Sequence, residues 1–246
     1  RTFATTDYGN AQRLVHAHGE NIRFSVGRWY VWDGARWRED KTQQVVRYAK
    51  RRVRLILDEI PKDADEATRK RYWGHACSSE SGRSLREMVR LTESEDSIAM
   101  EMEEFDTNAY LFNCKNGTVD LRAGEFRPHN RNDLITKVSP VHFDAESKCP
   151  QWESFLSRVF AKDYENPADV GDTDLIAFVQ RMFGYCLTGD VGEQVMPILW
   201  GSGSNGKTTM LKMASANISS TSLSFRISSS FKVNSTFFPN DRLNLS

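Results

Sequence analysis

A glycine-rich run near the end of this chain constrains its fold more than any other segment. Residues 201–208 read Gly-Ser-Gly-Ser-Asn-Gly-Lys-Thr, which fits the phosphate-binding pattern G-x-x-x-x-G-K-[ST]. The glycines let the backbone curl with positive φ and bring N–H groups close to phosphate oxygens. Lys207 is expected to reach the β- and γ-phosphates of ATP, and the Thr208 hydroxyl to bind Mg²⁺. The predicted cofactor-binding residues are Gly201, Ser202, Gly203, Ser204, Asn205, Gly206, Lys207 and Thr208.

The residues on either side of this loop have the patterns of a strand and a helix. Residues 195–200 form a short apolar run that predicts a buried strand, with Pro197 at its beginning or at an edge. Residues 208–214 predict the first turns of a helix whose N-terminus faces the phosphates. A surface loop rich in Gly and Ser is the alternative interpretation, and the flanking patterns favour the phosphate site.

Composition and charge limit the class of protein. The chain has 246 residues and is 39% hydrophobic, which is enough for a real core in one large domain or two smaller ones. Lys and Arg total 33, and so do Asp and Glu, so any contact with nucleic acid must be a local patch. No apolar stretch approaches the roughly 18 residues of a membrane span, and we expect no membrane contact.

The four cysteines lie more than 30 residues apart and form no C-x-x-C pair, which disfavours a zinc site. Together with the lack of a secretory signal, this spacing indicates reduced thiols in a cytoplasmic protein. The chain begins at Arg1 rather than at Met, so we expect it to be a fragment of something longer.

The spacing of apolar residues divides the chain into helical and β-like segments. Helices are predicted over residues 43–60, 67–76 and 85–92, followed by an acidic, solvated connection over 93–106. Asp33-Gly34 predicts a hairpin between residues 28–32 and 36–38. Residues 110–113, 117–121, 125–128 and 134–138 predict a small β meander. Two helical stripes follow: Trp152, Phe155, Leu156, Val159 and Phe160, and then Leu175, Phe178, Val179, Met182 and Cys186.

These patterns predict an α/β fold with several parts. We expect an α+β N-terminal domain over residues 1–150, mainly helical with a small β meander. A helical collar over 151–192 and the start of a P-loop ATPase over 193–214 are expected next. Residues 215–246 are expected to be an atypical tail, truncated or out of frame, because ten of the last 34 residues are Ser and only Asp241 is acidic.

Several blocks of sequence, in order along the chain, together resemble one known family. They are residues 6–14 (TDYGNAQRL), 29–34 (WYVWDG), 113–121 (NCKNGTVDL), 124–129 (GEFRPH), 133–137 (DLITK), 149–152 (CPQW) and 183–189 (FGYCLTG). These blocks are similar to the helicase half of phage and plasmid primases of the satellite-phage type. The same region is the N-terminal-like domain of poxvirus-type primase–helicases. In that family it precedes a superfamily 3 ATPase, and residues 201–208 fall where the ATPase begins.

The resemblance implies a ring-forming, hexameric, ATP-driven helicase of phage or plasmid replication, in the cytoplasm of a bacterial host. It implies single-stranded or origin DNA and a fused or separate primase as partners. The resemblance assigns no catalytic residue here. Hydrolysis needs an acidic residue after a second apolar strand, a sensor and an arginine finger, which residues 215–246 do not show. We therefore expect this chain to be catalytically incomplete; a non-catalytic adaptor that docks DNA or primase, with a vestigial nucleotide site, is the alternative.

Four further features each have a structural and a functional interpretation. The aromatic side chains at positions 29, 30, 32 and 37 are expected to pack a hairpin on a helix rather than stack on bases. The cations within residues 50–54 are expected to line a solvated helix face rather than contact phosphates. Asp172 and Asp174 are expected to cap a helix rather than bind a metal. His16 and His18 lack metal-ligand spacing.

Overall fold

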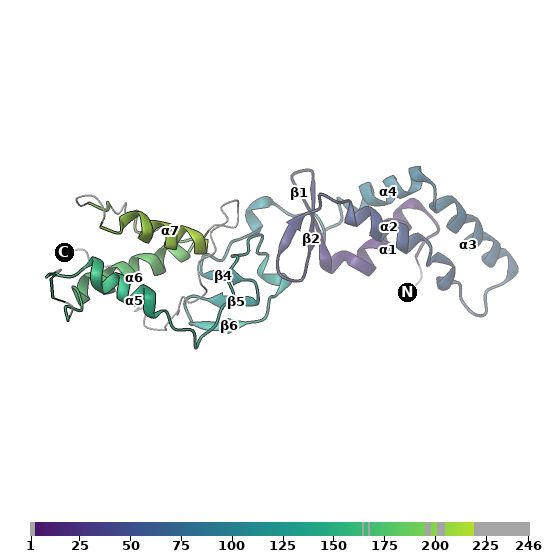
Figure 1. Cartoon of the computed structure of the whole chain (residues 1–246). Helices are drawn as coiled ribbons and strands as arrows, with labels where there is room; N and C mark the ends of the chain where they lie inside the picture. Colours follow the sequence, from purple (N-terminus) through teal and green to yellow (C-terminus); the bar gives the residue numbers. More distant parts are fainter. Residues whose placement is uncertain (1–2, 164, 167, 195–197, 201–204, 219–246) are drawn as a thin grey trace. The chain divides into compact units, whose positions relative to one another are not determined.

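The computed structural model describes residues 3–163, 165–166, 168–194, 198–200 and 205–218 (Figure 1). The chain divides into two compact units, Arg1–Thr107 and Asn108–Ser246. Each unit contains α-helices and a small antiparallel sheet, which confirms the predicted combination of helices and β meander. The finer division at residues 150, 192 and 214 stays a prediction.

In the first unit, α-helices pack beside a three-stranded sheet. Its elements are α1 (Asp7–His18), β1 (Ile22–Ser25), β2 (Arg28–Trp32), β3 (Trp37–Glu39), α2 (Gln44–Val53), α3 (Glu66–Ser79) and α4 (Gly82–Thr92), with 3-10 helices η1 (Gly19–Asn21), η2 (Ile56–Glu59) and η3 (Met102–Glu104). Helix α1 lies against both α2 and α4. The core between them includes Leu14, Ala49 and Met88, all fully buried. The predicted helices over 67–76 and 85–92 are confirmed as α3 and α4, whereas α1 was not predicted.

The hairpin predicted around Asp33-Gly34 is confirmed. Strands β2 and β3 pair antiparallel across this turn, and β1, which the sequence pattern did not predict, adds a third strand next to β2. Trp37 is fully buried, and the centroid of its ring lies 6.0 Å from that of Trp32. Trp29 packs against the core of the unit. The aromatic residues therefore pack inside the fold, as the structural interpretation expected.

The helix predicted over residues 43–60 is broken into two pieces. Helix α2 ends at Val53, and the chain then forms η2. Val53 and Ile56 are both buried, so the apolar stripe continues across the break and concealed it in the sequence. The break brings Glu59 back to pair with Arg52 of α2, an ion pair that a continuous helix would separate by about 10 Å.

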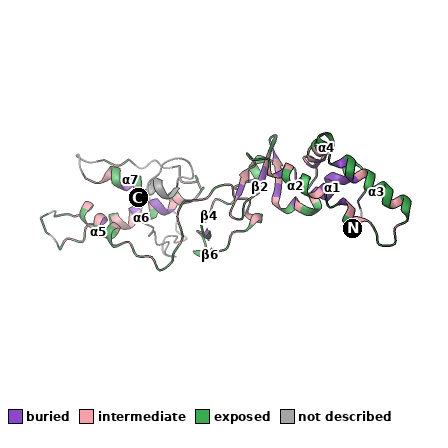
Figure 2. Cartoon of the chain, turned by 45° about the vertical axis from the view of Figure 1, so that its right-hand side comes forward, coloured by how far each residue is buried: buried purple, intermediate pink, exposed green. Residues whose placement is uncertain are grey.

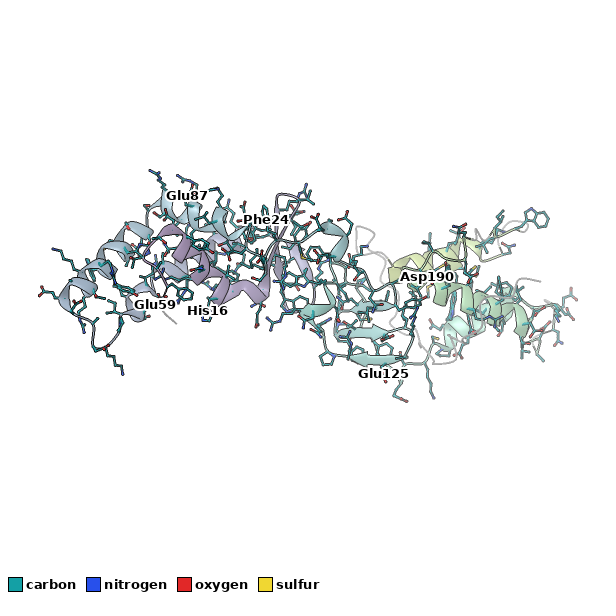
Figure 3. All side chains as sticks on the ribbon, turned by 180° about the vertical axis from the view of Figure 1, so that it is seen from behind. His16, Phe24, Glu59, Glu87, Glu125 and Asp190 are labelled. Atoms are coloured by element: carbon teal, nitrogen blue, oxygen red, sulfur yellow. The ribbon has the colours of Figure 1, made fainter. Side chains whose placement is uncertain are left out.

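A fully buried arginine, Arg13, ties several segments to α1. Its Nε lies 2.8 Å from Oε2 of Glu59, which is labelled in Figure 3. Its Nη1 donates to the carbonyl of Ala4 at 2.7 Å, and its Nη2 to that of Phe3 at 3.2 Å. Gly9 permits this approach, because a Cβ there would lie 2.0 Å from the Ala4 oxygen. Burial of a charge requires such partners.

The acidic segment at residues 93–106 is more than a solvated connection. Ile98 and Phe105 are buried, and Phe24 of β1 exchanges two backbone hydrogen bonds with the segment: its N–H donates to Ile98 at 2.8 Å, and its carbonyl accepts from Met100 at 3.0 Å. The acidic side chains of residues 101, 103 and 104 are exposed, as predicted. Two isolated apolar anchors give no periodic signal, which is why the sequence pattern suggested a free connection.

The unfolding free energy of this unit is expected to fall as the pH is lowered from 7.5 to 5. His18 stacks on Tyr48 of α2, and burial, then Arg52 and Arg51, lower the pKa of His18 below 6.5. As the pH falls through 6.5, His18 therefore binds a proton in the unfolded state before it does so in the folded state. The free energy of unfolding decreases as a result. Urea unfolding at both pH values should show a smaller pH dependence for His18→Gln than for the wild type; equal dependence would refute this role of His18.

The second unit begins with the predicted meander and continues with helices. Its elements are β4 (Leu111–Cys114), β5 (Gly117–Asp120), β6 (Glu125–Arg127), the 3-10 helix η4 (Arg131–Asp133), α5 (Pro150–Val159), α6 (Thr173–Leu187) and α7 (Lys207–Ile218). The strands pair antiparallel in the order β4-β5-β6, which confirms the first three predicted strands. Cys114, Val119 and Leu121 are buried at the centre of this sheet's apolar cluster.

The prediction of a fourth strand over residues 134–138 is wrong, because these residues have no strand structure. Leu134 follows η4 with a φ of +52°, which turns the backbone out of strand geometry. The segment nevertheless runs beside β4: Nδ2 of Asn113 donates to the carbonyl of Lys137 at 2.9 Å, and the N–H of Ser139 donates to the carbonyl of Asn113 at 2.7 Å. One side-chain bond and one backbone bond therefore stand in place of the expected ladder.

Helices α5 and α6 confirm the two predicted stripes, with a change of phase in α6. Val179 and Phe183 are buried, whereas Leu175 and Cys186 are exposed, so Phe183 takes the place predicted for Cys186. Oδ1 of Asp172 accepts from the N–H groups of residues 174 and 175 at 3.1 and 3.0 Å, which confirms the capping interpretation. Within the described residues, no helix is both long enough and apolar enough to cross a membrane.

Candidate phosphate-binding loop on helices α5 and α6

Helix α7 begins at Lys207, directly after the last glycine of the predicted loop. Gly206 has a φ of +81°, and its carbonyl accepts from the N–H of Met210 at 2.9 Å, so the first helical turn closes on it. The helix predicted after the loop is therefore confirmed. Residues 201–204 of the predicted site lie outside the described residues. At the described end of the loop, N–H groups of the first turn are left without helical acceptors.

Gly206 lies directly against α5. A Cβ at this position would be 2.8 Å from Cγ2 of Val159 and 3.0 Å from Cζ of Phe155. The positive φ is a second reason for glycine, because L-residues with a side chain avoid it. Gly206 therefore serves the turn into α7 and also lets the loop approach α5 closely.

Helix α7 is seated on an apolar platform, which we define as Trp152 and Phe155 of α5 with Val179 and Phe183 of α6. Met210 is almost fully buried against these side chains. The rings of Trp152 and Phe155 stack with centroids 5.3 Å apart. Figure 2 shows buried positions on α6 and α7 in this part of the unit. The sequence predicted the two stripes, but nothing in their spacing showed that they would support the loop.

Lys207 and Thr208 occupy the first turn of α7. The Lys207 side chain is partly buried, and its Nζ donates to Oδ1 of Asn205. Thr208 is exposed. A lysine ammonium, a hydroxyl and N–H groups that have no acceptor within the helix therefore meet at one helix N-terminus. Such an end attracts anions, because both the dipole and the N–H groups favour negative charge there.

The groups at the start of α7 suit a Mg²⁺ ion that arrives with a nucleotide, because such an ion does not need a cage of acidic side chains. In the part of the chain that the structure describes, no three His, Cys, Asp or Glu side chains gather to hold a metal. Mg²⁺ bound with a nucleotide takes most of its ligands from phosphate and water, so one exposed hydroxyl such as that of Thr208 suffices. His16 lies against Phe3, and His18 stacks on Tyr48.

The buried strand predicted before the loop is not found in its described part. Residues 195–197 lie outside the described residues, and residues 198–200 have no strand structure. Ile198 and Trp200 are 76% and 93% exposed, and Leu199 packs against the platform. A strand requires a neighbour for its backbone groups, and β4, β5 and β6 pair with one another.

Replacing Gly206 by valine is expected to weaken the seating of α7 by about 2–4 kcal/mol, since the side chain meets Val159 and Phe155 and requires a strained φ. Hydrogen exchange of the α7 amides should become faster by the factor that corresponds to this loss of free energy. Gly27→Val is the matched control, because Gly27 also has positive φ but has no atom within 4 Å of a Cβ. Unchanged exchange in Gly206→Val would show that α7 does not depend on this contact.

Comparison with known proteins finds similarity to a family model and to a viral protein. The model of a family described as D5 N terminal like matches residues 11–161. A protein named "Putative helicase L207/L206", from Acanthamoeba polyphaga mimivirus, is 27% identical to this chain over 116 residues. That alignment covers 46% of the chain and 11% of the viral protein, so the chain matches a small part of a much longer relative. The predicted loop at residues 201–208 follows the family match along the chain.

Proposed function

Because the chain belongs to the D5 N terminal like family, we propose that it is the N-terminal portion of an ATP-dependent DNA helicase of the primase–helicase type. The observation that carries the proposal is the start of α7 at Lys207, after a left-handed Gly206 and on the apolar platform. A helix that begins directly after a glycine supports this proposal, because phosphate loops use the N–H groups at a helix N-terminus. The name of the viral relative, a helicase, supports the same function.

In this proposal the loop residues 201–206 surround the phosphates with their N–H groups. Lys207 leaves the amide oxygen of Asn205 for the β- and γ-phosphates, since a charged oxygen is the stronger acceptor. Thr208 binds Mg²⁺, which when present neutralises phosphate charge. The platform fixes the start of α7 before the nucleotide arrives, so less ordering is required on binding.

We further propose a hexameric ring that acts on single-stranded or origin DNA with a fused or partner primase, in phage or plasmid replication in the bacterial cytoplasm. A ring matters chemically, because the arginine finger that completes a hydrolytic site is often supplied by a neighbouring molecule. Unwinding is in this proposal a property of the longer protein, of which the chain corresponds to one part.

Competition for a bound fluorescent ATP analogue tests this proposal. With Mg²⁺ present, ATP should displace the analogue at a concentration at least about a hundredfold below that of AMP. The reason is that charged hydrogen bonds to the outer phosphates contribute about 1.5–3 kcal/mol each. Equal potency of ATP, AMP and adenosine would mean that the chain has no site for the outer phosphates.

A polypeptide of residues 1–246 is expected to bind Mg·ATP without hydrolysing it appreciably. Beyond Thr208 the sequence holds one acidic residue, Asp241, and it follows Pro239, which is unsuited to a central strand. Phosphate release should stay at background with and without single-stranded DNA. DNA-stimulated turnover in the usual range of about 1–10³ s⁻¹ would contradict this prediction.

A further inference from the structure

Four cations form a stripe along the exposed face of α2. Arg47, Lys50, Arg51 and Arg54 follow one another at the i, i+3, i+4 and i+7 spacing, which places them on one side of a helix. All four are exposed, and we call them the basic stripe. The opposite side of α2 is buried in the core of the first unit.

The charge of the basic stripe is not compensated. The sequence has no acidic residue between Asp40 and Asp58. Arg47 donates to neutral acceptors of Thr42 and Gln44, and the other three cations form no ion pair with any described residue. Arg52, which lies between them in sequence, turns inward to Glu59 instead. Like charges at these spacings destabilise a helix, so the stripe disfavours folding unless an anion meets it.

We infer that the basic stripe binds the phosphodiester backbone of DNA. The inference rests on the proposed function, in which the longer protein handles DNA. The stripe extends about 10 Å along the helix axis, and a duplex presents one phosphate charge for about every 1.7 Å of its axis. Three of its four cations are arginines, whose guanidinium groups bind phosphate in a bidentate manner.

The geometry of α2 favours DNA over a membrane. A helix that binds a lipid surface inserts its apolar face, and the apolar face of α2 is occupied by the core of the unit. The positive field extends to α1, where Arg52 and Arg51 contribute, after burial, to the lowered pKa of His18. The chain has no net charge, so a local patch of this kind is where a polyanion would be held.

The test compares two triple variants of the whole chain that remove the same charge. Lys50→Gln, Arg51→Gln and Arg54→Gln neutralise the stripe and spare Arg47, whose local bonds belong to the fold. Arg83→Gln, Arg86→Gln and Arg90→Gln neutralise three exposed arginines of α4, where Glu87 pairs with Arg90 at 2.8 Å (Figure 3). Binding of fluorescein-labelled single-stranded and duplex oligonucleotides is measured at several salt concentrations.

The stripe variant should lose affinity at every salt concentration. The slope of log affinity against log salt should fall by about two for single strands and about three for duplex. Its urea midpoint should stay the same or rise, because repulsion within α2 is relieved. The α4 variant should bind like the wild type. Equal losses in both variants, no DNA binding by the wild type, or tighter binding to poly-glutamate or anionic vesicles would each overturn the inference. Nucleotide competition on the same samples tests the proposed function separately.

Discussion

Replacing Arg13 by methionine is expected to lower the free energy of unfolding of the first unit by about 3–5 kcal/mol. Methionine has a similar length but cannot bond to Glu59 or to the carbonyls of Phe3 and Ala4, which the buried guanidinium contacts. The loss is large because the carbonyls of Phe3 and Ala4 lose this donor, and the largely buried Glu59 loses one of its two ion pairs and keeps that with Arg52. Urea unfolding of the whole chain, followed by far-ultraviolet circular dichroism, measures the change.

Arg28→Met is the matched control for this prediction. Arg28 pairs with Glu39 at 3.2 Å, but its side chain is largely exposed, and exposed pairs contribute about 0–1 kcal/mol. A decrease below about 1 kcal/mol for Arg13→Met would mean that the N-terminal residues and η2 are not held to α1 through this arginine.

Replacing Lys207 by methionine is expected to weaken Mg·ATP binding about ten- to a hundredfold. The ammonium at the start of α7 is the cation that the loop offers to the outer phosphates, and a hydrogen bond to a charged group contributes about 1.5–3 kcal/mol. Affinity for AMP should change little, because AMP lacks the β- and γ-phosphates. Calorimetric titration of both nucleotides gives the two ratios.

Lys212→Met is the control on the same helix, since Lys212 is exposed and lies more than a turn beyond Lys207. It should leave both affinities within about twofold of the wild type. If the two lysine variants weaken Mg·ATP equally, the effect is one of overall charge, and the assignment of Lys207 to the phosphates is wrong.

The elements that the sequence predicted well are those with local signals. The hairpin has a turn dipeptide, Asp33-Gly34, and α6 has an N-cap, Asp172, before an apolar stripe. Helix α1 lacks such a stripe, because Asn10 and Arg13 take part in its buried face alongside Ala11 and Leu14. Buried polar side chains are satisfied by distant partners such as Glu59, and no spacing rule reveals a distant partner.

The sequence predicted the loop motif of the candidate site, but not the packing of α7 on α5 and α6 that holds this motif in place. The loop pattern predicted the helix that begins at Lys207, and a pattern of this kind is readable because backbone geometry fixes its glycines. The contact of Gly206 with Val159 and Phe155 depends on how α5 and α7 pack, which is a tertiary property. The same reason explains the error at residues 198–200, since an apolar run becomes a strand only beside another strand.

Nitrogen-15 NMR of the chain during titration with Mg·ATP tests the central claim most directly, because each backbone amide reports its own contact with the nucleotide. We predict saturable chemical-shift changes concentrated on the amides of residues 205–210, with the first unit unchanged. The claim would be contradicted if these amides did not respond to Mg·ATP, or if the responding amides lay in the first unit instead.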